Sequence, residues 1–347
     1  MSVRDLLMAA AQPPQQALPA ASLAVGWTAT PYVAAYDWSS SGFGSKFTNP
    51  SAIAGQGNIV NFSPDGAYLV VSHENSPYIS VFPWSASGFG TKFANPGTLP
   101  SGGGWGGSFS PDQAYVALAH QSSPYVSAYP WSSGGFGTRV ANPGTLPAGP
   151  GWGLAFSPDG AFVAVAHDNS PYVSVYPWSS SGYGTKVDNP STLPAGNGYG
   201  VSFSPDGAYI AVGHNTSPYI SAYPWSSGGF GTKFANPGTL PASLVNAITF
   251  SPDGAFVAVV HDSSPYVSVY PWSASGFGTK VNNPGTLPAG AGYGVAFSPD
   301  SAFIAVTHAN SPYFSVYPWS SSGFGTKVAN PGTLLTSQGI GVAFSIL

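Results

Sequence analysis

Short apolar segments separated by tight polar turns follow one another along most of the chain. Between residues 58 and 95 these segments cover 58–62, 67–73, 78–84 and 91–95. Their length, and the turns rich in Pro, Asp, Gly and Ser between them, are typical of β-strands. No window of helix length in this unit carries apolar residues at helical spacing, so we expect an all-β fold.

The four-segment unit repeats at an almost constant period. A tyrosine that follows proline marks each copy, with one spacing of 46 residues and five of 47: Tyr32, Tyr78, Tyr125, Tyr172, Tyr219, Tyr266 and Tyr313. Four-stranded units of about 40–50 residues, repeated seven times, are typical of a β-propeller. The sequence therefore predicts a seven-bladed β-propeller with four-stranded antiparallel blades over residues 21–347, preceded by an arm over residues 1–20.

The first and last copies of the unit are incomplete. The first copy begins with the second strand of the unit, at 22–27, and the last ends just after a first strand, at 339–345. Each end of the chain thus supplies a strand that the other end lacks. We expect the C-terminal strand to pair with the N-terminal blade, which closes the ring and removes both open sheet edges.

Composition excludes several classes of function. Charged residues make up 6% of the chain, and its formal net charge of −4 comes without a basic block, which argues against a nucleic-acid binder. No apolar run approaches the roughly 18 residues of a membrane span, so no membrane insertion is expected. The chain has no cysteine, which excludes disulfides and thiolate chemistry.

Every histidine of the chain closes the second strand of a copy: His73, His120, His167, His214, His261 and His308. Trp27 takes this position in the remaining copy. Neighbouring histidines on such a ring should lie roughly 10 Å apart, too far to share a metal ion, so no metal site is expected. We interpret them as structural residues hydrogen-bonded to neighbouring loops, and their place on one rim also makes them candidate binding residues.

The other repeated charged residues have structural explanations. Six aspartates belong to the "SPD" turn, which continues with Gly in four copies, Gln in one and Ser in one: Asp65, Asp112, Asp159, Asp206, Asp253 and Asp300. Turn chemistry accounts for them. Seven basic residues share one position in the fourth segment, where they would guard an outer strand against pairing with other chains: Lys46, Lys92, Arg139, Lys186, Lys233, Lys280 and Lys327.

Aromatic residues occur in two patterns. A tryptophan ends the third strand of every copy, where it is expected to cap the blade core. More variable aromatic residues open the first strand, on the histidine rim: Trp105, Trp152, Tyr199 and Tyr293. We predict that these four residues bind a partner loop or a sugar, with packing between blades as the alternative.

Signals of catalysis are missing from the sequence. No nucleophile elbow, phosphate loop or HExxH motif occurs, and the first strands carry no carboxylates that could converge on the central channel. The sequence therefore predicts no catalytic residues, no cofactor and no enzyme.

The segment "FSPDGAYLVVSH" at 62–73 resembles the blade segment of seven-bladed WD40/YVTN repeat proteins. The third strands end in "YPW" or "FPW" instead of Trp-Asp, so the histidine–aspartate network of WD40 proteins is not carried over. The longer consensus "SPYxSxYPWSxxGFGTKxxNPGTLP" and the opening "MSVRDLLMAAA" resemble bacteriophage structural proteins.

The phage resemblance implies a non-enzymatic structural or adhesion protein located in the virion. Its partners would be other virion or scaffold proteins, contacted through residues 1–20, or a host surface. The apolar stretch at 6–11 is too short for a typical secretory signal. Two alternatives remain open: a lectin-like propeller that binds surface glycans, and a general scaffold for protein interactions.

Overall fold

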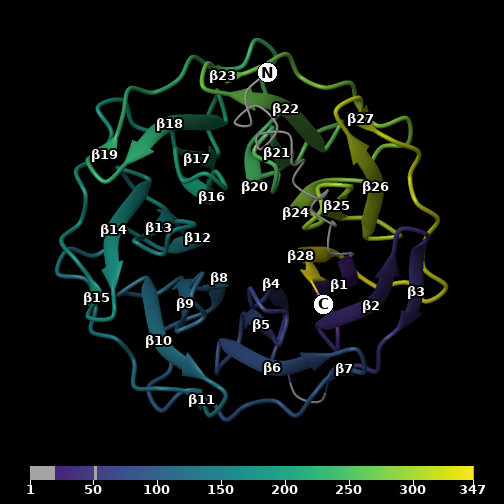
Figure 1. Cartoon of the computed structure of the whole chain (residues 1–347), viewed down its shortest axis with the longest axis horizontal. Coiled ribbons are helices and arrows are strands. Elements are labelled where there is room, and N and C mark those ends of the chain that lie inside the picture. Colours follow the sequence, from purple (N-terminus) through teal and green to yellow (C-terminus); the bar gives the residue numbers. More distant parts are fainter. Residues whose placement is uncertain (1–19, 51–52, 347) are drawn as a thin grey trace, which may run out of the picture.

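The computed structural model describes residues 20–50 and 53–346, and these residues form a ring of seven blades around a central channel (Figure 1). Each blade is a four-stranded antiparallel sheet. The described residues contain no helix, and so no helix among them that is long and apolar enough to cross a membrane. The predicted all-β, seven-bladed fold is confirmed.

The strands run from the channel outward in each blade. The innermost strands are β4 (Gly57–Phe62), β8 (Gly104–Phe109), β12 (Gly151–Phe156), β16 (Gly198–Phe203), β20 (Val245–Phe250), β24 (Gly292–Phe297) and β28 (Gly339–Ile346). The second strands are β1 (Ala20–Trp27), β5 (Tyr68–His73), β9 (Tyr115–His120), β13 (Phe162–His167), β17 (Tyr209–His214), β21 (Phe256–His261) and β25 (Phe303–His308).

The outer half of each blade consists of one long and one short strand. The third strands are β2 (Val33–Ser39), β6 (Ile79–Ser85), β10 (Val126–Ser132), β14 (Val173–Ser179), β18 (Ile220–Ser226), β22 (Val267–Ser273) and β26 (Phe314–Ser320). The outermost are β3 (Gly42–Lys46), β7 (Gly88–Phe89), β11 (Gly135–Phe136), β15 (Gly182–Tyr183), β19 (Gly229–Phe230), β23 (Gly276–Phe277) and β27 (Gly323–Phe324).

The two ends of the propeller meet in one composite blade. Its strand order is β28-β1-β2-β3, and β28 pairs antiparallel with β1, with Leu23 opposite Phe344 and Val25 opposite Val342. In Figure 1 the yellow C-terminal strand lies beside the purple N-terminal strand. The predicted closure of the ring by the C-terminal strand is confirmed.

The outermost strand is shorter than the sequence pattern predicted. The segment 91–95 is not a strand: the ladder with β6 ends at β7, and one further backbone hydrogen bond joins the Phe93 amide to the Val81 carbonyl at 3.0 Å. The cause is Pro83 in β6: its carbonyl accepts from the Gly90 amide at 2.8 Å, but it has no N–H to return. The first blade provides a control, because it has Asp37 at this position and its outer strand β3 extends from Gly42 to Lys46.

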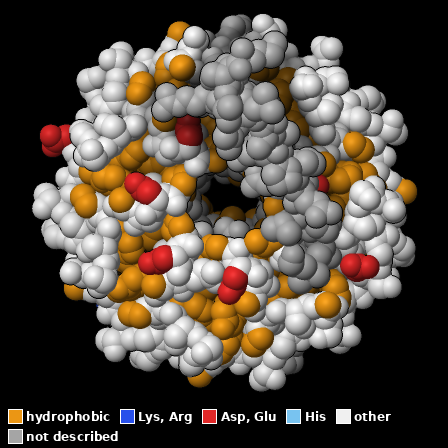
Figure 2. Space-filling view, viewed as in Figure 1, with side chains coloured by type: hydrophobic (Ala, Val, Ile, Leu, Met, Phe, Trp, Pro, Cys, Tyr) orange, Lys and Arg blue, Asp and Glu red, His pale blue; other side chains and the backbone are white. Residues whose placement is uncertain are grey.

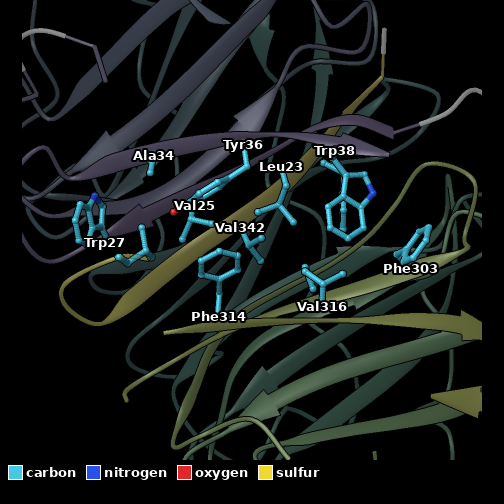
Figure 3. Packing of buried hydrophobic residues seen from close by; sticks show 13 residues of the cluster. Leu23, Val25, Trp27, Ala34, Tyr36, Trp38, Phe303, Phe314, Val316 and Val342 are labelled. Carbon is cyan, nitrogen blue, oxygen red and sulfur yellow. The ribbon is translucent and has the colours of Figure 1, made fainter. Parts of the chain in front are cut away.

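The hydrophobic core is a series of clusters, each shared by neighbouring blades. Figure 3 shows the cluster at the ring closure, where Tyr36 of β2 packs against Phe314 of β26, with 5.5 Å between ring centroids. The tryptophan that ends each third strand caps a cluster, as expected: Trp84 contacts Phe89 edge-to-face at 4.9 Å. Since each blade buries its faces against its neighbours, the ring is stabilised mainly by contacts between blades.

One contact between blades shows how the copies have adjusted to one another. Val245 opens β20 at a position where the other inner strands begin with glycine, and Gly213 in β17 faces it. A Cβ atom at Gly213 would lie 2.3 Å from Cγ1 of Val245. In the preceding blade the roles are reversed, with Ala166 facing Gly198.

Gly213→Ala is therefore expected to destabilise the protein by about 1–3 kcal/mol, because the added methyl overpacks the contact. In the Val245→Gly background the same change should cost much less, since the pair then reproduces Ala166 and Gly198. Denaturant unfolding of the four members of this double-mutant cycle measures the coupling. An equal cost of Gly213→Ala in both backgrounds would show that the contact does not limit packing.

Candidate functional site

Each histidine is held by a hydrogen bond to a serine of the adjacent third strand. His73 Nδ1 lies 2.8 Å from the carbonyl of Asn75, and its Nε2 lies 3.0 Å from Ser80 Oγ. A carbonyl only accepts, so Nδ1 carries the proton and Nε2 accepts from the serine hydroxyl. The other pairs have Nε2–Oγ distances of 2.9–3.1 Å: His120–Ser127, His167–Ser174, His214–Ser221, His261–Ser268 and His308–Ser315.

The six histidines have no exposed surface, with relative accessibilities of 0%. Burial lowers the pKa of His73 to about 4, so the imidazole is neutral at pH 7. In the first blade Trp27 replaces the histidine and Ala34 replaces the serine, so both members of the hydrogen-bonded pair are replaced together. The candidate binding role of the histidines needs correction, because buried imidazoles offer a ligand nothing to contact.

The repeated charged residues also make local contacts. Ser63 Oγ donates to Asp65 Oδ1 at 2.6 Å, and the Ala67 amide donates to the same oxygen at 2.9 Å, which closes the SPDG turn. Lys92 Nζ donates to Asn95 Oδ1 at 2.5 Å on the outside of the ring. Within residues 20–50 and 53–346, no three His, Asp or Glu side chains are grouped to hold a metal ion.

The central channel contains a cavity of about 770 Å³. Figure 2 shows one face of the ring hollowed at its centre. Each inner strand contributes its second residue to the channel wall at the histidine rim: Asn58, Trp105, Trp152, Tyr199, Asn246, Tyr293 and Ile340. We call this end of the channel, together with the adjoining Gln56, Asp262 and Gln338, the channel mouth.

Glycines directly after several of these residues bring the inner strands close together. A Cβ atom at Gly153 would lie 2.7 Å from the carbonyl oxygen of Tyr199, and one at Gly106 would lie 2.8 Å from the Leu154 amide. Because neighbouring strands approach this closely, the side chains that precede the glycines stand side by side around the mouth.

Three of the four predicted aromatic residues form a continuous wall at the mouth. The ring centroids of Trp105 and Trp152 are 4.9 Å apart, and those of Trp152 and Tyr199 are 5.7 Å apart, edge-to-face. All three are half-buried. They therefore pack between blades and also present ring surface to the channel.

A carboxylate stands next to this wall. Asn246 Nδ2 donates to Asp262 Oδ1 at 2.7 Å and to the carbonyl of Gly292 at 2.8 Å, so the amide orients an otherwise exposed carboxylate. Burial raises the pKa of both Tyr199 and Tyr293, and the negative charge of Asp262 raises both further. Asp262 thus lies within electrostatic reach of two phenol groups that keep their protons at neutral pH.

Amide side chains complete the polar part of the mouth. Asn58 donates to the carbonyl of Gly104 at 2.7 Å and accepts from Gln56 Nε2 at 2.8 Å, and Gln338 also lines the channel. Below the mouth, apolar residues such as Val201 line the channel. This contrast places the groups capable of chemistry at the histidine rim.

Sequence reasoning missed Asp262 because it considered carboxylates of the first strands only. Asp262 belongs to the loop between β21 and β22, directly after His261. The available signal was variation at this one position of the repeat: Glu74, Gln121, Asp168, Asn215, Asp262 and Ala309. A position that takes five different residue types in six blades, beside a histidine that is the same in all six, indicates a surface with unequal surroundings.

No protein-family profile and no curated protein matches this chain. Among solved structures, the periplasmic gluconolactonase PpgL of Pseudomonas aeruginosa is similar, with a TM-score of 0.72 and 20% identity over 93% of this chain and 98% of that one. A Bacteroides fragilis protein provisionally named 6-phosphogluconolactonase has a TM-score of 0.71 and 13% identity over 96% and 99% of the two chains. At these identities the similarity shows the fold.

The lactonase names contradict the expectation of a non-enzymatic phage structural or adhesion protein, including its lectin-like and scaffold alternatives. They equally contradict the prediction that the chain is not an enzyme. Virion location, host recognition and carbohydrate binding find no support in these comparisons, and the WD40/YVTN resemblance reduces to the seven-bladed fold. The repeated blade residues are determined by packing within the propeller. Because propellers host many unrelated functions, these residues do not distinguish one function from another, and this caused the error. The predicted docking arm, apart from Ala20, lies outside the described residues.

Proposed function

We propose that this protein hydrolyses a sugar lactone at the channel mouth. The observation that carries the proposal is Asp262, a carboxylate that accepts from Asn246 at 2.7 Å and lines the same 770 Å³ channel as Tyr199 and Tyr293. The lactonase names of two similar structures support the same reaction class.

The proposed reaction needs a base, a nucleophile and a donor for the carbonyl oxygen. Asp262 takes a proton from a water molecule, whose oxygen attacks the lactone carbonyl carbon. The hydroxyl of Tyr199 or Tyr293 donates to the oxygen on which negative charge develops. The ring C–O bond then breaks, the ring oxygen recovers the proton, and the product is a hydroxy acid.

The remaining residues of the mouth suit a hydroxylated ring. The aromatic wall of Trp105, Trp152 and Tyr199 offers apolar ring surface for the C–H face of such a substrate. Gln56 and Gln338 line the mouth and can hydrogen-bond its hydroxyl groups. A few polar groups on a largely apolar wall are typical of small-molecule sites.

Asp262→Asn is expected to lower the rate of glucono-1,5-lactone hydrolysis by about 10²–10⁴-fold, because the general base is lost while the shape of the side chain is kept. A pH-stat measurement of acid release, corrected for spontaneous hydrolysis, gives the rate. Asp188→Asn is the matched control, since Asp188 is an exposed carboxylate on the outer segment and does not line the channel. Full activity in Asp262→Asn would remove Asp262 from the mechanism.

A further inference from the structure

The positive charges of the described chain all lie on the outer segments of the blades and not in the channel wall. They occupy one position per blade on the outer segment: Lys46, Lys92, Arg139, Lys186, Lys233, Lys280 and Lys327. None of them lines the channel. The lysines that form hydrogen bonds donate to residues of the same outer segment, as Lys92 Nζ does to Asn95 Oδ1 at 2.5 Å.

The loops of the histidine rim carry acidic residues but no basic ones among the described residues, while six further aspartates lie in the SPD turns at the opposite rim. The residue that follows the conserved histidine is acidic in three blades: Glu74, Asp168 and Asp262. Asp262 lines the mouth, and the charges of Asp168 and Asp262 both raise the pKa of Tyr199. Asp262 on the channel wall and Asp168 within electrostatic reach of Tyr199 therefore give the mouth a negative potential, which no basic residue of the described lining offsets.

We propose that the channel mouth selects uncharged sugar lactones and rejects their phosphorylated counterparts. The inference rests on the proposed function and specifies its substrate class. A phosphate ester carries a charge of about −1.5 to −2 at neutral pH and is normally bound by Arg, Lys or helix N-termini. The described residues offer none of these at the mouth, where the phosphate would lose water beside carboxylates and aromatic rings.

The first experiment compares glucono-1,5-lactone with its 6-phosphate as substrates of the unmodified protein. We expect kcat/KM to be at least about tenfold higher for the uncharged lactone, because Asp262 on the channel wall, with Asp168 behind it, repels the phosphate. Added salt should narrow this ratio by screening the repulsion. Equal hydrolysis of both lactones, or a preference for the phosphate, would overturn the inference and leave the proposed function standing.

A second experiment adds a positive charge to the rim. Gln121 is exposed and follows His120, so it has the place in its blade that Asp262 has in another. The backbone N–H of Gln121 donates to the carbonyl of Gly103 at 3.1 Å. Gly103 precedes Trp105 of the aromatic wall by two residues. Gln121→Lys is expected to raise kcat/KM for the phosphorylated lactone about tenfold and to leave the uncharged lactone unaffected.

Ser133→Lys is the matched control for this variant. It changes the net charge equally, but Ser133 is an exposed residue of the turn between β10 and β11, on the opposite rim. It should leave both substrates unchanged. An equal effect of the two lysines, or no effect of Gln121→Lys, would mean that charge at the mouth does not set specificity.

If neither lactone is hydrolysed, the proposed function fails and binding decides the inference. The probes are then 1,5-anhydroglucitol and its 6-phosphate, which have the sugar ring but no carbonyl, with quenching of tryptophan fluorescence as the readout. Tighter binding of the uncharged ring supports selection by charge. Tighter or equal binding of the phosphate, or binding of neither, contradicts it.

Discussion

Lowering the pH from 7 to about 5 is expected to unfold the ring in a single cooperative transition. The six histidines are fully buried, and burial lowers the pKa of five of them to about 4: His73, His120, His214, His261 and His308. The pKa of His167 is lowered for the same reason. In the unfolded chain the same groups titrate near 6.5, so the unfolded state binds more protons between these two values.

The direction and size of the effect follow from this difference. The stability that the histidines contribute is complete above about pH 6.5 and is lost progressively as the pH falls toward 4. At pH 5 the loss is about 2 kcal/mol for each histidine, or about 10 kcal/mol for five. Since typical proteins are stable by about 5–15 kcal/mol, this loss is comparable to the whole free energy of unfolding, and we expect it to unfold the ring.

Circular dichroism and denaturant unfolding between pH 7 and 4 test the prediction. The double variant His73→Trp/Ser80→Ala copies the Trp27–Ala34 pair of the first blade and removes one titrating group. The slope of the unfolding free energy against pH should decrease by the contribution of one histidine, because the unfolded chain then takes up one proton fewer. Carboxylates that titrate below about pH 4 would give a later transition, so stability that stays constant from pH 7 to 4.5 would refute the histidine account.

Deleting residues 339–347 is expected to destabilise the whole ring, and not only one blade. The deletion removes β28, which pairs with β1 and buries Val342, Ala343 and Phe344 against the neighbouring blades. It also leaves the inner edge of β1 unpaired. Losing these contacts should cost about 5 kcal/mol or more, comparable to the total stability of a typical domain.

Thermal unfolding of the shortened protein measures this loss. A synthetic peptide of residues 339–347 added in trans should restore much of the melting temperature, because it can pair with β1 as β28 does. A peptide of the same composition in scrambled order is the control. An unchanged melting temperature after the deletion would mean that closure contributes little to stability.

The sequence by itself determined the number of blades, the strands of their inner three positions and the closure of the ring. These features depend on local chemistry: the predicted segment 58–62 became β4 (Gly57–Phe62) because SPDG ends the strand wherever it occurs. Because the unit repeats seven times, each strand and turn could be assigned from seven similar segments. The candidate aromatic residues of the mouth were found in the same way, as variable positions within a constant frame.

Only the tertiary structure decided how short the outermost strand is. Proline has no N–H, so Pro83 interrupts pairing only with the strand that this N–H would have faced. The register of β6 against β5 and β7 decides which of the two strands that is. The same holds for the histidines. Their position in the sequence was compatible with an exposed rim, but packing of the blades buried them against serines such as Ser80.

The candidate site, too, exists only in the closed ring. Tyr199, Asn246 and Tyr293 are separated by 47 residues each, and Asp262 belongs to a different loop. The ring brings them together because each inner strand starts at the same rim, so equivalent positions of successive blades become neighbours around one channel. Chemistry that needs several blades is invisible in any single repeat, because each repeat supplies only one or two side chains to the mouth.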